Sequence, residues 1–312
     1  YSAALPQILK KCGLNTFITT KISWNDQNRM PYDTFEWKGI DGTTILTHFI
    51  TTPAGKETTM YSYNGMIDAA SLRGIWDNYS NKGLNSDLLL CYGYGDGGGG
   101  PTRDMLENLR VLSQIPGMPA VKTERVDEYC ARLCETVKEN SFYAYQPVWE
   151  GELYLEFHRG TYTSQAYNKK MNRKMEFLLR NTEFALSCAM LRGEDTSARQ
   201  GELNEIWKQI LCGQFHDIIP GSSIHEVYKD TREMYQKTEA AAKRILQDSL
   251  NLQGSPDHYT ALNTANWERS SVVEIAGDFT NMYFEAEDAA VCKQVCGPDK
   301  AVLLLEKLPP MA

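Results

Sequence analysis

This sequence of 312 residues lacks long apolar runs and clusters of basic side chains. The longest apolar stretches, residues 88–92 and 301–305, fall far short of the ~18 residues that a membrane-spanning helix needs. The 40 Asp and Glu outnumber the 32 Lys and Arg, and the resulting net charge of −8 offers no patch for a phosphate backbone. We therefore expect no membrane and no nucleic acid as partner, and a neutral ligand fits the charge better.

The eight cysteines include no CxxC pair, and most lie within apolar periodic segments. The two CxxxC pairs lack the further soft ligands that a zinc site needs. We therefore expect buried, reduced thiols and a cytoplasmic location rather than a disulfide framework. The chain begins at Tyr1 without an initiator Met or an apolar leader, so we expect an N-terminal portion to be missing.

The content of 42% hydrophobic and 23% charged residues is typical of globular proteins, and the length predicts two or three domains. Three segments of the first half have the length and β-branched content of strands: residues 15–22, 43–51 and 87–92. Helices are expected at residues 6–12 and 103–112, with Thr102 as the N-cap of the second. Strands that alternate with helices predict an α/β layer or barrel.

The second half has a different pattern. Residues 165–191, 202–217 and 224–250 repeat apolar positions at helical spacing, and breaks at residues 193–201 and at Pro220–Gly221 separate them. A small antiparallel three-helix bundle is the natural packing for such segments. Residues 259–267 and 270–277 then resemble strands, and they predict the beginning of a β domain.

The run GYGDGGGG, residues 93–100, lies between a predicted strand and a predicted helix. It contains GxGxxG, which in a dinucleotide site lets the backbone approach a pyrophosphate. Asp96, however, would place a carboxylate among the phosphates, and no acidic ribose-binding residue follows at the expected distance of ~20 positions. The remaining hypotheses are a loop that presents one acid at a strand end and a flexible turn with an incidental Asp.

The segment QFHDIIPGSS, residues 214–223, ends the second predicted helix. At about 100° per residue, Asp217 falls on the apolar face of that helix and His216 at its edge. A buried carboxylate must be paired, hydrogen-bonded or close to a cation. The alternative is that Asp217 leaves the helix to cap a neighbouring element and that His216 is a core histidine with satisfied hydrogen bonds.

Other histidines and one aromatic segment invite plainer interpretations. His48 and His258 are expected to be structural, and the segment HEVYK at His225 departs from the HExxH zinc pattern. Residues 147–170 are dense in aromatic and acidic side chains where the two halves meet. Such a segment suits either a polyhydroxylated ligand or an interdomain interface.

Together, five segments resemble the α-mannosidases of glycoside hydrolase family 38, in the cytosolic or bacterial branch with GDGGGG: KISWNDQNRMPYDTFEWKGIDGT, GYGDGGGGPTRDMLE, GELYLEFHRGTYTSQAYNK, QFHDIIPGSS and YTALNTANWER. The resemblance implies a multi-domain α/β plus α chain. Residues 1–153 would be the C-terminal part of a catalytic α/β barrel, residues 154–252 the middle three-helix bundle and residues 258–312 the beginning of a C-terminal β-sandwich domain.

The resemblance also implies a retaining glycosidase with two catalytic carboxylates, which acts on mannose-containing oligosaccharides. A divalent metal, usually zinc, would be bound by two His and two Asp, and the sequence leaves cobalt open as an alternative to zinc. Residue by residue, His216 maps to a metal ligand, Asp217 to a substrate-binding residue and Asp96 to the acid/base. Trp24 and Arg159 lie in motifs that border the pocket, as do Asn25 and His158. The family also suggests a homo-oligomer.

Two expected parts of the family site have no match in these residues, namely the HxD metal motif and the aspartate that serves as nucleophile. With one of four metal ligands and one of two catalytic carboxylates, the 312 residues alone are expected to be inactive. The alternative hypothesis is a carbohydrate-binding or structural remnant without catalysis.

Overall fold

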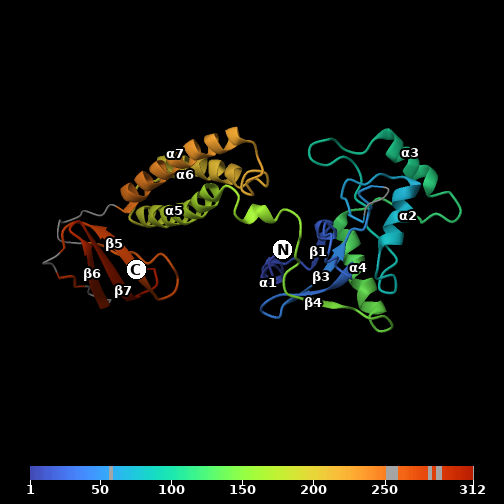
Figure 1. Cartoon of the computed structure of the whole chain (residues 1–312), viewed down its shortest axis with the longest axis horizontal. Helices are drawn as coiled ribbons and strands as arrows, with labels where there is room; N and C mark the ends of the chain where they lie inside the picture. Colours follow the sequence, from blue (N-terminus) through green and yellow to red (C-terminus); the bar gives the residue numbers. More distant parts are fainter. Residues whose placement is uncertain (56–58, 251–258, 280–282, 286–289, 312) are drawn as a thin grey trace. The chain divides into compact units, whose positions relative to one another are not determined.

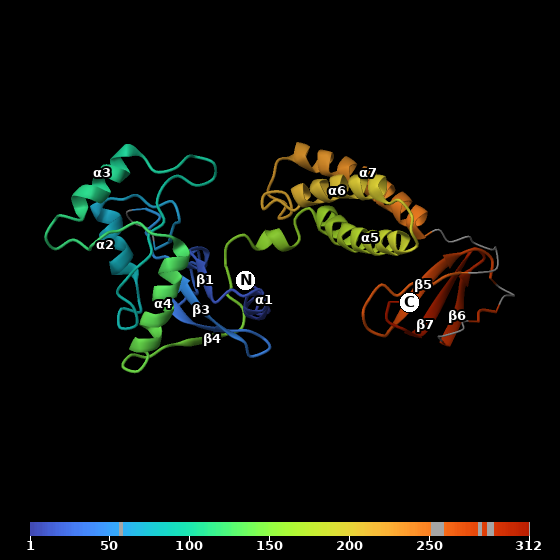
Figure 2. The same ribbon diagram turned by 180° about the vertical axis from the view of Figure 1, so that it is seen from behind.

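The computed structural model describes residues 1–55, 59–250, 259–279, 283–285 and 290–311. They form two compact units, Tyr1–Arg159 and Gly160–Ala312, here called the N-terminal and the C-terminal unit (Figures 1 and 2). Each unit mixes helices with a β-sheet. None of the helices among the described residues combines the length and the apolar character that crossing a bilayer requires.

A four-stranded mixed sheet lies at the centre of the N-terminal unit, with the strand order β1-β3-β2-β4. Its strands are β1 (Thr16–Thr19), β2 (Thr34–Lys38), β3 (Thr44–Phe49) and β4 (Val148–Glu150). β3 pairs parallel with β1 and antiparallel with β2, and β4 joins β2 in parallel. The strands predicted within residues 15–22 and 43–51 are confirmed, whereas β2 and β4 were not predicted.

Four helices belong to this unit: α1 (Leu5–Lys11), α2 (Ala69–Asn78), α3 (Arg103–Leu112) and α4 (Val126–Asn140). The predictions of α1 and α3 are confirmed, and Thr102 is the N-cap of α3, because its hydroxyl accepts a hydrogen bond from Met105 N at 3.3 Å. The aromatic core of the sheet includes Phe35, Trp37 and Phe49, all fully buried. Leu46 of β3 packs against α4 in a separate cluster.

The strand predicted at residues 87–92 is wrong. This segment is extended but irregular, and its ladder contacts reduce to one bridge between Tyr92 and Gly65. Gly65 N donates to Cys91 O at 3.0 Å, and Gly93 N donates to Gly65 O at 3.1 Å. The apolar pattern therefore reflects the packing of the partly buried Leu89 and Leu90 against core clusters rather than strand pairing.

His48 is structural, as expected. Its ring is buried in β3, where Nδ1 lies 2.8 Å from the Thr34 hydroxyl and Nε2 lies 3.1 Å from the Tyr129 hydroxyl. Desolvation lowers the pKa of His48 to about 3. The neutral imidazole thus joins two strands of the sheet to α4. His258 lies outside the described residues.

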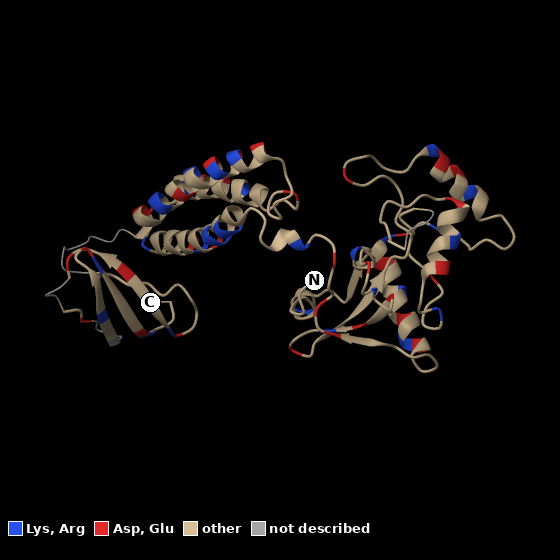
Figure 3. Cartoon of the chain, viewed as in Figure 1, with Lys and Arg blue, Asp and Glu red and all other residues tan. Residues whose placement is uncertain are grey.

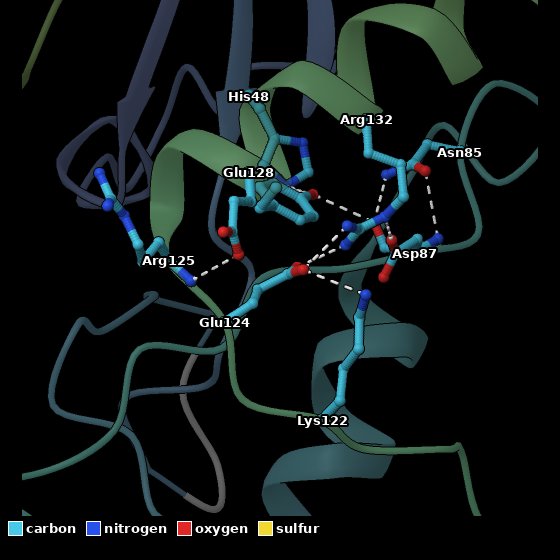
Figure 4. A network of polar contacts seen from close by, with 9 residues as sticks. His48, Asn85, Asp87, Lys122, Glu124, Arg125, Glu128 and Arg132 are labelled. Carbon is cyan, nitrogen blue, oxygen red and sulfur yellow. Dashed lines mark hydrogen bonds and ion pairs between the residues drawn. The ribbon is translucent and has the colours of Figure 1, made fainter.

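An ionic network next to His48 fastens α4 to two irregular segments (Figure 4). Arg132 donates to Asp87 Oδ2 at 2.6 Å and binds both carboxylate oxygens of Glu124, which also pairs with Lys122. The hydrogen bonds from Arg132 are the main reason that the pKa of Glu124 falls to about 2. This bidentate arrangement fixes the start of α4 against residues 85–87.

The C-terminal unit contains three long helices, α5 (Ala166–Leu191), α6 (Ser197–Gly213) and α7 (His225–Leu250). They share one core, which includes Met175, Leu179, Leu203, Ile210 and Tyr235. Charges of both signs are interspersed along their outer faces (Figure 3), as in the pairs of Glu239 with Lys174 and Lys243. All three helices were predicted, but α6 ends at Gly213 rather than at Asp217.

The C-terminal unit also contains an antiparallel sheet with the order β5-β7-β6, formed by β5 (Arg269–Ala276), β6 (Ala290–Gly297) and β7 (Lys300–Leu308). The strand predicted at residues 270–277 corresponds to β5. The strand predicted at residues 259–267 is wrong, because Asn263 there holds an irregular segment by donating to the carbonyl oxygens of Trp267, Leu308 and Pro309. Arg180 of α5 donates to Thr264 O at 3.0 Å and ties this segment to the helices.

The cysteines differ in burial from the prediction. All eight are free thiols, but none is fully buried, and Cys12, Cys212, Cys292 and Cys296 are exposed. Cys12 caps the C-terminus of α1, and Cys292 and Cys296 lie on β6, an edge strand of its sheet. The apolar periodicity of these segments therefore reflects the burial of residues next to the cysteines rather than of the cysteines themselves.

Because folding excludes a proton from His48, acid should weaken the N-terminal unit. The unfolded histidine titrates near its ordinary value of 6.5 and the folded one at about 3. Between these values the free energy of unfolding should fall by about 1.4 kcal/mol for each pH unit of acidification, and it should be insensitive to His48 above pH 6.5. Urea unfolding at several pH values should show this slope reduced in His48→Gln and retained in the exposed control His225→Gln. Parallel curves for all three proteins would contradict the assignment.

Candidate functional site

Asp96 lies on the exposed glycine loop between Gly93 and Gly100. Its backbone is in the left-handed region, at φ 55°, and the loop closes through a hydrogen bond from Gly98 N to Gly95 O at 2.9 Å. Tyr63 OH donates to Asp96 Oδ1 at 2.9 Å. This bond raises the pKa of the Tyr63 phenol, because ionising it would place two negative groups side by side.

Two glycines of this loop are required by close approach. A Cβ at Gly93, where φ is +110°, would lie 3.2 Å from Gly100 C, where the loop returns on itself. A Cβ at Gly95 would lie 2.3 Å from Oδ1 of Asn64 and 2.6 Å from Cε2 of Tyr63. The glycine run thus allows the loop to press its main chain against the Tyr63 ring and leaves Asp96 as its one charged side chain.

The geometry does not fit a dinucleotide site. The segment before the loop is not a strand, and α3 starts only at Arg103, after Pro101 and Thr102. The GxGxxG fingerprint requires a strand directly before the loop and a helix N-terminus directly at it.

Lys21 connects the surroundings of Asp96 to Trp24. Its ammonium lies 5.4 Å from the Tyr63 ring centroid and 5.5 Å from that of Trp24, within the range of cation–π attraction. The Trp24 indole donates to Tyr61 O at 3.0 Å, and its ring meets Phe157 edge-on with centroids 6.4 Å apart.

Glu156 holds the loop that follows Trp24. Its carboxylate accepts hydrogen bonds from the backbone N of residues 26, 27 and 28 at 2.6–2.8 Å, and from Nδ2 of Asn28. These donors, with that of Gln27 foremost, lower the pKa of Glu156. The buried Asn25 completes the junction, because it accepts from Glu156 N at 2.7 Å and donates to Tyr154 O at 3.0 Å.

The Glu156 carboxylate and the backbone N–H groups of residues 26–28 are here called the Glu156 clamp. Arg159 follows Glu156 by three residues. Its Nε donates to Glu156 O at 3.1 Å, and its guanidinium lies 5.4 Å from the Tyr154 ring. The preceding His158 is in the left-handed region at φ 65°, with its ring 6.4 Å from that of Phe157. Contacts therefore run from Asp96 through Tyr63 and Lys21 to Trp24, and from there through Phe157 to the segment of Arg159.

The structure thus links three of the predicted residues, Asp96, Trp24 and Arg159, in one unit. It adds three side chains that the sequence did not indicate as functional: Lys21, Tyr63 and Glu156. Only Glu156 had a signal, since it lies in the segment rich in acids and aromatics. Tyr63 and Lys21 contact residues that are far away in the sequence, so no local sequence pattern could predict these contacts.

His216 and Asp217 lie in the C-terminal unit, in a turn after α6. Both side chains are exposed, at 75% and 61%, and His216 Nε2 lies 3.7 Å from Asp217 Oδ2. The prediction that Asp217 lies on the apolar face of a helix is wrong, and so is the alternative of a core histidine. The helix ends at Gly213, and residues 215–219 close tight turns instead. Pro220, which lacks an N–H group, cannot continue a helix after them.

The alternative in which Asp217 leaves the helix describes this turn better. The Asp217 carbonyl accepts hydrogen bonds from the hydroxyls of Ser223 at 2.6 Å and Ser222 at 3.4 Å. His216 stacks on Phe215, with ring centroids 4.3 Å apart. The main chain at this turn is thus fixed, while the imidazole and the carboxylate face solvent.

A metal site requires more ligands than these. Among the residues that the structure describes, no three His, Cys, Asp or Glu side chains gather closely enough to hold a metal ion. The residues present therefore do not form a zinc site by themselves. A cavity of about 360 Å³ in the N-terminal unit contains none of the predicted site residues; its lining includes Lys10, Glu36, Cys134, Lys138 and Gln146.

Two family models match the chain. Residues 1–152 match the glycosyl hydrolases family 38 N-terminal domain, and residues 156–252 match the alpha mannosidase middle domain. Among curated relatives, alpha-mannosidase G of Dictyostelium discoideum is 39% identical over 80% of this chain and 22% of its own length. The alpha-mannosidase of Saccharomyces cerevisiae is 39% identical over 73% of this chain and 21% of its own.

The chain thus spans about a fifth of the length of these curated relatives. Among solved structures, an alpha-mannosidase from Enterococcus faecalis matches 100% of this chain and 41% of its own, with a TM-score of 0.59 and 15% identity, a likeness of fold. With two adjoining family models over residues 1–252 and relatives of the same kind, the chain belongs to glycoside hydrolase family 38.

Proposed function

We propose that this chain is part of a retaining, divalent-metal-dependent α-mannosidase that hydrolyses terminal α-mannosidic linkages in oligosaccharides. The observation that carries the proposal is Asp96, an exposed carboxylate on a glycine loop, fixed by Tyr63 and linked by contacts to Trp24. The names of the relatives over most of the chain support the substrate class. The nucleophile and the remaining metal ligands would come from outside these 312 residues, and the chain alone would be inactive.

In this proposal Asp96 is the acid/base. One carboxylate oxygen accepts the hydrogen bond from Tyr63, and the other carries the proton. The acid gives this proton to the glycosidic oxygen as the bond to the sugar breaks. In the second step the carboxylate takes a proton from the water that attacks the glycosyl-enzyme.

Trp24, Arg159 and Asp217 would bind the sugar. An indole offers an apolar face to the C–H groups of a mannose ring, while a guanidinium and a carboxylate offer donors and acceptors to its hydroxyls. Trp24 and Arg159 are held in place by the clamp of Glu156. Asp217 is held by the serine hydroxyls on its carbonyl.

His216 would supply one ligand to the divalent metal, zinc or cobalt, because its exposed imidazole can reach ligands from other parts of the protein. We also propose the domain order described for the family: residues 1–153 from a barrel, 154–252 from a helical bundle and 258–312 from a β-sandwich. Eight free thiols favour a cytoplasmic location. A homo-oligomer is proposed by resemblance to the family.

Replacement of Asp96 by Ala tests the catalytic assignment in the complete polypeptide that contains this chain. Hydrolysis of mannosides with poor leaving groups should fall by about 10²–10⁴-fold in kcat/KM, because the glycosidic oxygen then leaves without a proton. The loss should be much smaller for 2,4-dinitrophenyl α-mannoside, whose leaving group needs no acid. Asp104→Ala removes a neighbouring exposed carboxylate and should leave both rates unchanged. Equal rates for Asp96→Ala and Asp104→Ala would favour the catalytically inactive remnant.

Replacement of His216 by Ala tests the metal. Mass spectrometry on the purified complete polypeptide should find about one divalent ion per chain, and His216→Ala should lose most of it, because a four-ligand site does not hold zinc well with three. His225→Ala, an exposed histidine nearby in sequence, should keep the metal. Unchanged metal content in His216→Ala would show that this histidine is not a ligand.

A further inference from the structure

We propose that Tyr63 is a positioning residue for Asp96, which acts by holding one oxygen of the carboxylate so that the other is presented to the substrate. The inference rests on the proposed function, because it assigns a task to Tyr63 in the same reaction. It is carried by the 2.9 Å hydrogen bond from the phenol to Oδ1 and by the close fit of the glycine loop on the Tyr63 ring.

Asp96 needs such a partner because its own loop supplies little restraint. The Cβ positions of Gly97, Gly99 and Gly100 meet nothing within 4 Å, so the loop is open on that side. Among the described residues, the hydrogen bond from Tyr63 is the one hydrogen bond that the Asp96 carboxylate makes. A carboxylate on such a loop would otherwise rotate among several orientations.

Tyr63, in contrast, belongs to a well-fastened segment. Two residues before it, Tyr61 is 3% exposed, and its backbone N donates to the Ser23 hydroxyl at 2.8 Å. Ser62 N donates to Thr52 O at 2.8 Å, and Gly65 N donates to Cys91 O at 3.0 Å. The backbone on both sides of Tyr63 is therefore fixed, which restrains the position of its phenol.

The Tyr63 ring is also restrained on its faces and edges. Lys21 lies over it, 5.4 Å from the centroid, and the same ammonium lies over Trp24. The backbone of Gly95 packs so closely on the ring edge that a methyl group there would collide with it. Because Asp96 follows Gly95 directly, this packing places the Asp96 carboxylate next to the phenol hydroxyl.

Tyr63→Phe separates the hydrogen bond from the packing. It removes the hydroxyl that donates to Asp96 Oδ1 and retains the ring on which the glycine loop packs. The variant should therefore lose the restraint on the carboxylate while the loop keeps its place.

The first experiment compares Tyr63→Phe with the wild-type complete polypeptide. For a mannoside with a poor leaving group, kcat/KM at the optimum should fall roughly 10- to 150-fold, the cost of one hydrogen bond to a charged group. For 2,4-dinitrophenyl α-mannoside the cleavage step should be nearly unaffected. Tyr94→Phe alters an exposed phenol on the glycine loop itself and should match the wild type in its rates with both mannosides.

A second pair of variants tests the fit of the loop without touching the phenol. Gly95→Ala should displace the loop from the Tyr63 ring and reproduce the selective loss seen with poor leaving groups. Gly100→Ala adds the same methyl group where nothing lies within 4 Å, and it should leave the rates unchanged. Equal effects of the two substitutions would overturn the proposed contact.

The background of Asp96→Ala separates this inference from the proposed function. If Tyr63 acts through Asp96, Tyr63→Phe should cause no further loss in that background, so that the two effects are not additive. If Asp96→Ala is impaired but Tyr63→Phe keeps the wild-type leaving-group dependence, the positioning role is wrong and the acid/base assignment stands. If Asp96→Ala itself is fully active, the proposed function fails first.

Discussion

The site in the N-terminal unit depends on one interaction, the carboxylate of Glu156 on the backbone N–H groups of residues 26–28. These groups are 128–130 positions apart in the chain. The pairing of β4 with β2 brings the two segments close, and the Glu156 clamp fixes them. Trp24 lies just before one half of the clamp and Arg159 just after the other. The ring contact of Trp24 with Phe157 and the hydrogen bonds of Asn25 reinforce this junction.

Much of the fold could be predicted from local patterns. Helices α5, α6 and α7 are long, and each buries a continuous apolar stripe. Such a helix can be recognised from the spacing of apolar residues in its own sequence. The end of α6 was misplaced because an apolar face continues into Ile218 and Ile219 after the helix has stopped. Strand β2 was missed although it pairs with the next strand, β3, across residues 39–43. Residues 87–92 were wrongly predicted as a strand because packing against a core selects the same apolar residue types as a strand.

The candidate site was predictable only where a motif names a residue. Asp96 and His216 stand in recognisable strings, and both were identified before any geometry. The companions that give Asp96 its orientation were not, because Tyr63 lies 33 positions away and its role arises from a fold that brings the two together. His216 illustrates the opposite case: its motif is recognisable, and the structure places its exposed imidazole in a turn beside Phe215 and Asp217.

The Glu156 clamp has a consequence for how this region can evolve or be redesigned. Because the carboxylate recognises main-chain N–H groups, the side chains of Asp26 and Gln27 take no part in it. Those positions are open to almost any amino acid other than proline, which lacks the N–H group. Next to the Trp24 indole, the side chains at positions 26 and 27 can therefore vary while the backbone conformation of this loop is conserved.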